Sequence, residues 1–404
     1  MNAASIAALA VFAVTYLGIA IGRLPPLRID RAGIALVGGS LMLAIGGMSV
    51  ADVTAAIDFN TIALLLGMMI VVANLRLSGF FRLVNGWIAT RAHQPLLLLA
   101  AVAFSAGLFS AFLLNDAICL VMTPLVLDIV QRLRRDPVPY LLAVAMAANI
   151  GSEATITGNP QNILIGSFSG IPFGRFAAAL SPPAVVGLLL TIALIALVYR
   201  HEFGSRMAFH SRPVRAHMHR PLAAKSVVVV VVMMAAFFAG QPPAKVALVA
   251  GGFMLLTRVM RSERVYREID WPLLLMFAGL FVVVAGFEKA LLTPDLVTRI
   301  GSFGLDSMPV LGIATAVLSN FVSNVPAVLV LKPFLAQAAE PQRSWLVVAM
   351  ASTFAGNLTV LGSVANLIVV QQAQARGVAI GFWEYFRVGA PLTLLTIAFG
   401  LWWL

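Results

Sequence analysis

Four short polar stretches interrupt long apolar segments of this chain, and their side chains are of types that bind small solutes and ions. Two precede position 170: Asn115-Asp116 and Gly158-Asn159-Pro160-Gln161-Asn162. Two follow position 320: Ser323-Asn324 and Gly362-Ser363-Val364-Ala365-Asn366. Amides and hydroxyls can hydrogen-bond an anion or coordinate a sodium ion, and a carboxylate near hydrocarbon can carry a proton or bind sodium. The stretches therefore indicate binding chemistry.

These stretches form two matching pairs. Thr155, Gly158 and Asn162 recur 204 residues later as Thr359, Gly362 and Asn366. The pattern Ser110-x-Phe112-x-x-Asn115 recurs 209 residues later as Ser319-x-Phe321-x-x-Asn324, and Ile57-Asp58 recurs 212 residues later as Ile269-Asp270. Offsets that fall so smoothly indicate that one unit was duplicated. In a membrane chain this is typical of a secondary transporter, whose site lies where two repeats meet.

The composition predicts an all-α polytopic membrane protein. Of 404 residues, 61% are hydrophobic and only 11% are charged, against roughly 25% charged in a soluble domain. Apolar stretches recur at close to the roughly 20 residues that a crossing helix needs. The first of them, 4–22, lacks a basic leading region and a small-residue cleavage site, so we interpret it as a retained helix rather than a cleaved signal.

The charge pattern argues against nucleic acid as the partner of this chain, despite its net charge of +11. Basic clusters alternate along the chain with loops nearly free of Lys and Arg, such as 49–59 and 168–174. By the positive-inside rule, this alternation places the N-terminus outside and the basic loop 200–222 in the cytoplasm. The first half then crosses the membrane an odd number of times, so the second half is inverted. Asp58 is expected outside and its counterpart Asp270 inside.

The expected architecture is two inverted repeats with about ten transmembrane helices, two re-entrant hairpins and two broken helices. The first repeat spans 1–200, a cytoplasmic linker spans 201–222, and the second repeat spans 223–404. The hairpins are 95–131 and 307–338, since each is interrupted by polar residues into arms of roughly 15 residues, too short to cross fully. Two full helices joined by a polar turn are the alternative, which would spoil the charge alternation.

The broken helices are expected at 138–170 and 344–374, because Gly-, Asn- and Pro-rich sequence lies there within apolar sequence. Unwound backbone at membrane depth is tolerated only where it is buried in protein or lines a cavity. The free N–H groups and carbonyls at half-helix ends can hold an anion or a cation.

These motifs resemble the ion-transporter superfamily that contains arsenical pump membrane proteins, citrate-transporter-like permeases and sodium/dicarboxylate symporters. The resemblance covers about 30–400 and implies a scaffold with a mobile transport domain, sodium or proton coupling, and often a homodimer. The dicarboxylate symporters carry Ser-Asn-Thr at both hairpin tips, whereas here the tips read Leu114-Asn115-Asp116 and Ser323-Asn324-Val325. The match therefore moves toward the arsenical-pump and uncharacterised anion-permease branch.

The candidate site residues come from the four polar stretches. We expect the substrate to be bound by Asn115, Gly158, Asn159, Pro160, Asn162, Ser323, Asn324, Gly362, Ser363 and Asn366. We expect the coupling ion to be bound by Asp116, Glu153, Thr155, Asn357 and Thr359. The two acids have no acidic counterpart, since Asp116 matches Val325 and Glu153 matches Asn357. A capping role for Asp116 and an interior hydrogen-bonded role for Glu153 are the structural alternatives.

Together these features predict a secondary transporter of a small inorganic or organic anion, or of an oxyanion such as arsenite, in a bacterial inner membrane. Coupling to sodium or protons, import and export all stay open, and arsenite or antimonite efflux by proton exchange is the alternative. We expect no cofactor and no metal beyond a sodium ion, since the single Cys119 and the loop motif His217-Met-His219 lack partners at metal-ligand spacing. A membrane enzyme or a channel is disfavoured, because neither explains the duplicated broken helices.

Overall fold

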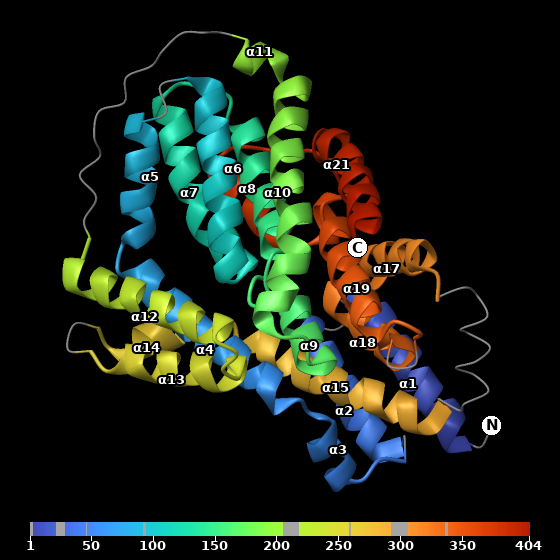
Figure 1. Cartoon of the computed structure of the whole chain (residues 1–404). Helices are drawn as coiled ribbons and strands as arrows, with labels where there is room; N and C mark the ends of the chain where they lie inside the picture. Colours follow the sequence, from blue (N-terminus) through green and yellow to red (C-terminus); the bar gives the residue numbers. More distant parts are fainter. Residues whose placement is uncertain are drawn as a thin grey trace.

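The computed structural model describes residues 3–21, 29–45, 47–91, 94–204, 218–257, 260–291, 306–335 and 338–404. Over these residues the chain is helical and contains no strand, which confirms the predicted all-α class (Figure 1). Most of the predicted linker, with His210 and His217, lies outside the described residues. The helix that follows it begins at Arg220, two residues before the predicted end of the linker.

The first half contains eleven described helices. They are α1 (Ala3–Ile21), α2 (Arg31–Ile45), α3 (Val50–Ala56), α4 (Phe59–Leu77), α5 (Phe80–Arg91), α6 (Pro95–Phe112), α7 (Asn115–Arg132), α8 (Pro137–Ser152), α9 (Pro160–Ser169), α10 (Phe173–Val198) and α11 (Arg200–Phe203). The described elements of the second half are α12 (Arg220–Phe238), α13 (Pro243–Leu255), α14 (Ser262–Tyr266), α15 (Trp271–Leu291), α17 (Met308–Val322), α18 (Asn324–Leu335), α19 (Pro341–Ala355), the 3₁₀ turn η1 (Val360–Gly362), α20 (Val364–Gln374) and α21 (Phe382–Trp403).

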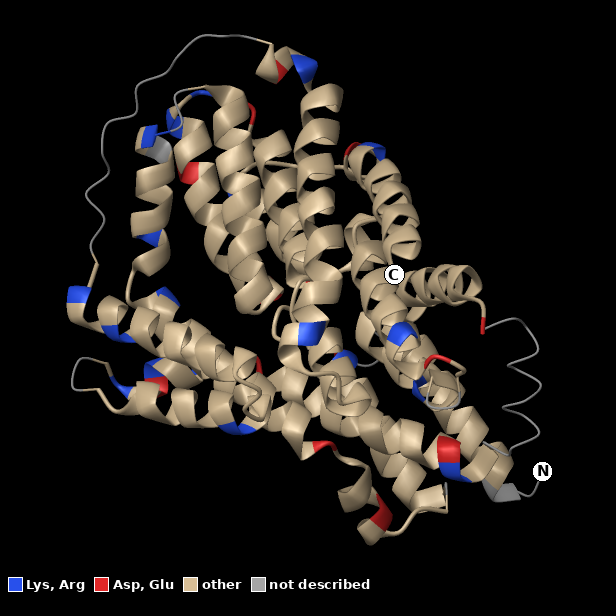
Figure 2. Ribbon diagram, in the orientation of Figure 1, with Lys and Arg blue, Asp and Glu red and all other residues tan. Residues whose placement is uncertain are grey.

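Six of the described helices, α4, α6, α10, α12, α15 and α21, are long and apolar enough to cross a bilayer. Charged side chains lie mostly near helix ends, and long stretches of α6, α8 and α10 carry none (Figure 2). Large apolar side chains such as Val185, Leu189 and Leu394 are more than half exposed. A hydrocarbon environment would cover these surfaces, as expected for membrane-spanning helices.

The helices form two groups. The scaffold group comprises α1, α2, α4, α12, α13 and α15, and the hairpin group comprises α6 to α10 and α17 to α21. In Figure 1, α6, α7, α8 and α10 stand side by side above α4, α12 and α13, which run across them. Within the hairpin group the strongest packing joins α6 with α8, α17 with α19, and α7 with α20.

A matched pair of close contacts ties the two halves together inside the scaffold group. Gly67 of α4 lies against Ala247 of α13, where an added Cβ would come within 2.4 Å of the Ala247 carbonyl carbon. Gly279 of α15 lies against Ala35 of α2 in the same way, at 2.5 Å. Both members of each pair are 212 residues from their counterparts, the offset that the sequence gives for Asp58 and Asp270. Small residues allow this close helix approach in membranes.

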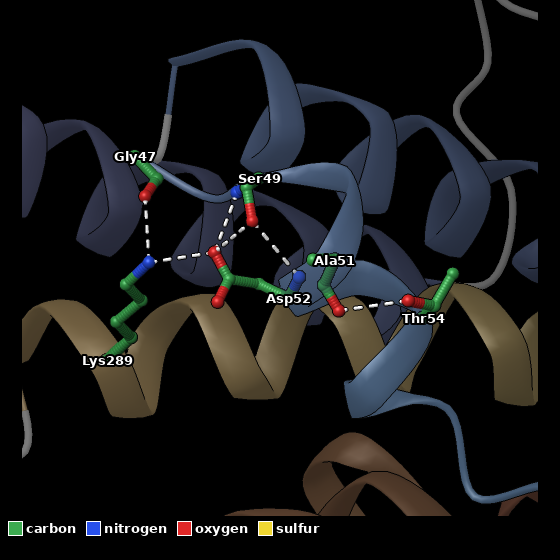
Figure 3. A network of polar contacts seen from close by, with 6 residues as sticks. All are labelled: Gly47, Ser49, Ala51, Asp52, Thr54 and Lys289. Atoms are coloured by element: carbon green, nitrogen blue, oxygen red, sulfur yellow. Dashed lines mark hydrogen bonds and ion pairs between the residues drawn. The ribbon is translucent and has the colours of Figure 1, made fainter.

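Short α3 is fastened to the end of α15 by a polar network. Lys289 Nζ donates to Asp52 Oδ2 at 2.8 Å and to the Gly47 carbonyl at 3.3 Å (Figure 3). The Ser49 backbone N–H and hydroxyl also donate to Asp52 Oδ2, at 2.7 and 2.8 Å. Lys289 and Ser49 together hold the pKa of Asp52 below its usual range. The carboxylate is therefore ionised at neutral pH, and the network would be lost only as the pH falls through that lowered pKa.

Candidate functional site

Each predicted hairpin is two helices joined by a very short turn. α6 and α7 are joined by Leu113 and Leu114, and α17 and α18 by Ser323 alone. The arms α6 and α7 have 18 residues each, longer than the arms the sequence predicted. The tip of this hairpin is nevertheless inside the protein: Leu113 is 2% exposed, and the Asn115 N–H donates to the Gly158 carbonyl at 2.9 Å. The first hairpin tip thus lies against the first broken helix.

Each broken helix is closed by one buried asparagine. Between α8 and α9, Asn162 Nδ2 donates to the carbonyls of Ser152, Glu153 and Thr155 at 3.3, 3.4 and 3.1 Å. Between α19 and α20, Asn366 Nδ2 donates to the carbonyls of Gly356 and Thr359 at 2.7 and 3.1 Å. Gly356 and Thr359 lie 204 residues after Ser152 and Thr155. These asparagines satisfy carbonyls that a helix end leaves without partners.

The helices that follow the breaks begin with side-chain caps. Asn159 Oδ1 accepts from the Asn162 N–H at 2.8 Å at the start of α9, and Ser363 Oγ accepts from the Ala365 N–H at 3.2 Å at the start of α20. Gly158 is required by close approach, since a Cβ there would lie 2.1 Å from the Ser152 carbonyl oxygen. A Cβ on Gly362 would lie 2.8 Å from the Gly356 carbonyl oxygen.

Two residues that the sequence did not single out join the breaks to each other. Asn149 Nδ2 donates to the Oδ1 atoms of Asn357 and Asn366, both at 2.9 Å. Its own Oδ1 accepts from Asn115 Nδ2 at 3.2 Å and from Ser363 Oγ at 3.1 Å. Asn149 therefore links the first hairpin tip to the second broken helix.

Thr353, 204 residues after Asn149, makes the converse link. Its Oγ1 accepts from Asn159 Nδ2 at 3.3 Å and from Gln161 Nε2 at 3.1 Å, so it joins α19 to the first break. Asn149 and Thr353 lie inside the matched segments, and their polar side chains within long apolar helices were the signal that could have found them.

A cavity of about 630 Å³ lies where both hairpin tips meet the starts of α9 and α20. Six of the predicted site residues line it: Asn115, Asp116, Pro160, Ser323, Asn324 and Ser363. The other nine do not line it and belong to the breaks behind it: Gly158, Asn159, Asn162, Gly362, Asn366, Glu153, Thr155, Asn357 and Thr359. Gln161 and Gln371 add amides, and Asp30, Arg31 and Asp270 add charges from the scaffold side. Sequence reasoning did not place these five residues in the site.

The hairpin tips present hydrogen-bond acceptors that the protein leaves unused. Asn115 Oδ1 and Asn324 Oδ1, matched by the repeat, are both buried and have no hydrogen-bond partner among the described residues. An unsatisfied buried acceptor costs about 1–3 kcal/mol, so such groups need a reason to persist. Two of them at one cavity indicate a bound donor or cation.

The two candidate acids differ in their surroundings. Asp116 is half-buried in the first turn of α7 and lines the cavity, and its carboxylate makes no hydrogen bond or ion pair with the described residues. Glu153 is fully buried at the end of α8. Thr353 and Asn162 lie near enough to interact with it, but neither of its carboxyl oxygens has a hydrogen-bond partner in the described ranges. Only Asp116 can meet a solute in the cavity directly.

Ser323 holds an unusual backbone conformation at the second tip. Its φ of 76° and ψ of 160° lie in a region that only glycine occupies readily, at a cost of about 1–3 kcal/mol for other residues. We expect Ser323→Gly to raise the thermal unfolding temperature of the purified protein, by an amount equivalent to roughly 1 kcal/mol. The matched control is Ser307→Gly, since Ser307 has an ordinary φ of −82°. That change should lower stability instead. Equal shifts in both variants would contradict the strain at Ser323.

Comparisons with known proteins agree with this arrangement. A family model described as "Citrate transporter" matches residues 16–355. A 46 kDa membrane protein of Mycobacterium leprae is 31% identical over 98% of this chain and 96% of its own length. The silicon efflux transporter LSI3 of Oryza sativa subsp. japonica is 29% identical over 93% of each chain. The crystal structure of the Alcanivorax borkumensis YdaH transporter, at 15% identity, superposes with a TM-score of 0.59 over 99% of this chain and 97% of that one, which shows a shared fold.

Proposed function

Because this chain belongs to the citrate transporter family and is a multi-pass membrane transporter, we propose that it moves a small hydroxylated oxyacid or its singly charged anion, coupled to a proton or a sodium ion. The hairpin group carries the solute, and Asp116 carries the coupling ion. Asn115, Asn324 and the hydroxyls of Ser323 and Ser363 contact the solute in the cavity. Movement of the hairpin group against the scaffold group would expose the cavity to one side and then the other.

The unused acceptors of the hairpin tips carry this proposal. Asn115 Oδ1 and Asn324 Oδ1 can accept hydrogen bonds or coordinate a cation, but they repel a bare anionic oxygen. The charges agree, because Asp30, Asp116 and Asp270 line the cavity against one basic side chain, Arg31. Weak oxyacids such as silicic and arsenous acid are uncharged at neutral pH and present only hydroxyl groups. They fit such a lining better than a multiply charged anion.

A second candidate is a carboxylate anion, which the family model's description favours. Arg31 could pair with one carboxylate group of such a solute. The three acids of the cavity would then require accompanying cations, which predicts a strict dependence of transport on sodium, on protons or on a divalent ion.

Flux into proteoliposomes separates these candidates. The panel is arsenite, antimonite, silicic acid, sulfate, phosphate, citrate and succinate, each with and without sodium and with an imposed pH gradient. The oxyacid proposal predicts gradient-dependent flux of arsenite, antimonite or silicic acid and none of citrate or succinate. Flux of citrate or succinate alone would overturn it in favour of the second candidate.

The orientation in the membrane is supported by the way the loops gather. Asn60, Gly170 and Gln241, all from loops expected outside, line one cavity of about 400 Å³. Arg76, Arg132 and Glu268, all from loops expected inside, line another of about 690 Å³. We therefore propose an inner-membrane protein with its N-terminus outside and residues 200–222 in the cytoplasm. The homodimer implied by the family resemblance stays a prediction, to be tested by mass measurement in detergent.

Single cysteines test this orientation after the buried Cys119 is replaced by alanine. In intact cells, an impermeant maleimide should modify cysteines at Ala51 and Gln241 but not a cysteine at position 210. Lysed cells serve as the control, because there all three positions should react. Modification of position 210 in intact cells would reverse the proposed orientation.

A further inference from the structure

The largest of the cavities described above, of about 690 Å³, is lined by the end of α4, α5, α7 and the segments around Glu268 and Arg376. It shares no residue with the candidate site. Four arginines line it, Arg76, Arg82, Arg132 and Arg376, against two acids, Asp128 and Glu268. The hydrogen bonds and ion pairs of these residues show how the charges are distributed.

Each wall of this cavity contains its own ion pair. On the scaffold side, Arg76 of α4 pairs with Glu268. On the hairpin side, Arg376 Nη1 pairs with Asp128 Oδ1 at 2.7 Å and also donates to the Pro124 carbonyl at 3.1 Å. This leaves Arg82 on the scaffold side and Arg132 on the hairpin side. Both are exposed, and neither has an ion-pair partner among the described residues. Each wall therefore carries a net positive charge.

The repeat-related cavity shows the opposite arrangement. Glu288 of α15 lies 212 residues after Arg76, and it faces Lys332 of the second hairpin at 3.7 Å. This ion pair crosses from the scaffold group to the hairpin group. The cavity around it is about 320 Å³ and also holds the paired Asp52 and Lys289, so its acids and bases are equal in number. Here opposite charges connect the two groups directly, whereas at the arginine-lined cavity two positive walls face each other.

We infer that the arginine-lined cavity binds a phosphate group, which bridges Arg82 on the scaffold side and Arg132 on the hairpin side. A guanidinium matches phosphate oxygens in shape and charge, and a phosphate between like-charged walls removes their repulsion. With the orientation proposed above, the cavity lies at the cytoplasmic surface. Basic pockets between membrane helices on that side meet the headgroups of acidic lipids. The headgroup of an acidic phospholipid and soluble phosphate share this chemistry.

Thermal unfolding of the purified chain in detergent tests this site with two probes. One arm adds phosphatidylglycerol, with phosphatidylcholine as its reference, and the other adds inorganic phosphate, with chloride at equal ionic strength as its reference. We expect stabilisation by phosphatidylglycerol. Arg82→Gln and Arg132→Gln should each raise the lipid concentration needed for half of the effect about fivefold, the change that corresponds to roughly 1 kcal/mol per basic residue. Stabilisation by inorganic phosphate as well would identify the phosphate group alone as sufficient.

Arg264→Gln is the matched control, because Arg264 is an exposed arginine of α14 on the same expected side and does not line the cavity. It should leave the lipid response unchanged. The inference is wrong if neither probe stabilises the wild-type chain. It is equally wrong if Arg264→Gln weakens the response as much as Arg82→Gln does, since that result would reflect general surface charge.

Discussion

Asp116→Asn is expected to reduce gradient-driven flux roughly ten- to hundredfold, as expected when an interaction of about 1.5–3 kcal/mol with an ionised group is lost. The amide keeps the shape of the side chain but can neither release a proton nor offer a full negative charge to sodium. Because Asp116 lines the cavity and has no partner among the described residues, nothing else in its surroundings would compensate. The measurement is flux of the transported solute into proteoliposomes under an imposed proton or sodium gradient.

Two further measurements make this result specific to coupling. Exchange of solute without a gradient should be partly retained in Asp116→Asn, since the hairpin tips still bind the solute. If sodium is the coupling ion, the sodium concentration for half-maximal flux should rise. The control is Asp306→Asn, an exposed carboxylate outside the cavity. Unchanged flux and unchanged ion dependence in Asp116→Asn would reduce this residue to a structural role, and Glu153→Gln would then test the remaining acid of the first repeat.

Gly158→Ala is expected to abolish the folded state or destabilise it by roughly 3 kcal/mol or more, beyond the usual cost of an extra methyl group in a packed interior. The added Cβ would lie 2.1 Å from the Ser152 carbonyl oxygen, closer than the 3.0 Å that real Cβ atoms keep. Moving Gly158 away would also strain the bond from the Asn115 N–H to its carbonyl, and with it the first hairpin tip. Fluorescence-detected size exclusion after heating measures the loss.

Gly252→Ala is the matched control for this change, since Gly252 lies in α13 with open space around an added Cβ. It should be neutral or slightly stabilising, because alanine favours a helix more than glycine does. If Gly158→Ala behaved like Gly252→Ala, the first broken helix could not have the close geometry described here.

The helices and hairpins could be predicted from the sequence because hydrophobic length, charge alternation and internal repetition are local or periodic signals. The interruptions at Asn115, Gly158, Asn324 and Gly362 all mark helix ends in the structure. The roles of individual polar residues could not be predicted in the same way. Asn162 and Asn366 look like ligand-binding residues in the sequence, but in the structure their Nδ2 atoms donate to backbone carbonyls of the breaks. Which side an amide faces depends on packing between distant helices.

The scaffold residues of the cavity illustrate the same limit. Arg31 and Asp270 belong to segments that charge counting assigns to loops, and they reach the cavity only because α2 and α15 pack together through Ala35 and Gly279. No spacing within the sequence places them near Asp116. Asn149 was hidden for a similar reason, since its partners Asn357 and Asn366 come from the other repeat.

A cryo-electron microscopy map of the chain in lipid nanodiscs, with the solute that the flux panel selects, tests the central claim most directly. We predict density for one solute molecule in the cavity between the two hairpin tips, within hydrogen-bond distance of Asn115 Oδ1 and Asn324 Oδ1. Solute density in the cavity lined by Asn60 and Gln241, or hairpin tips on opposite membrane surfaces, would contradict a single site shared by both repeats.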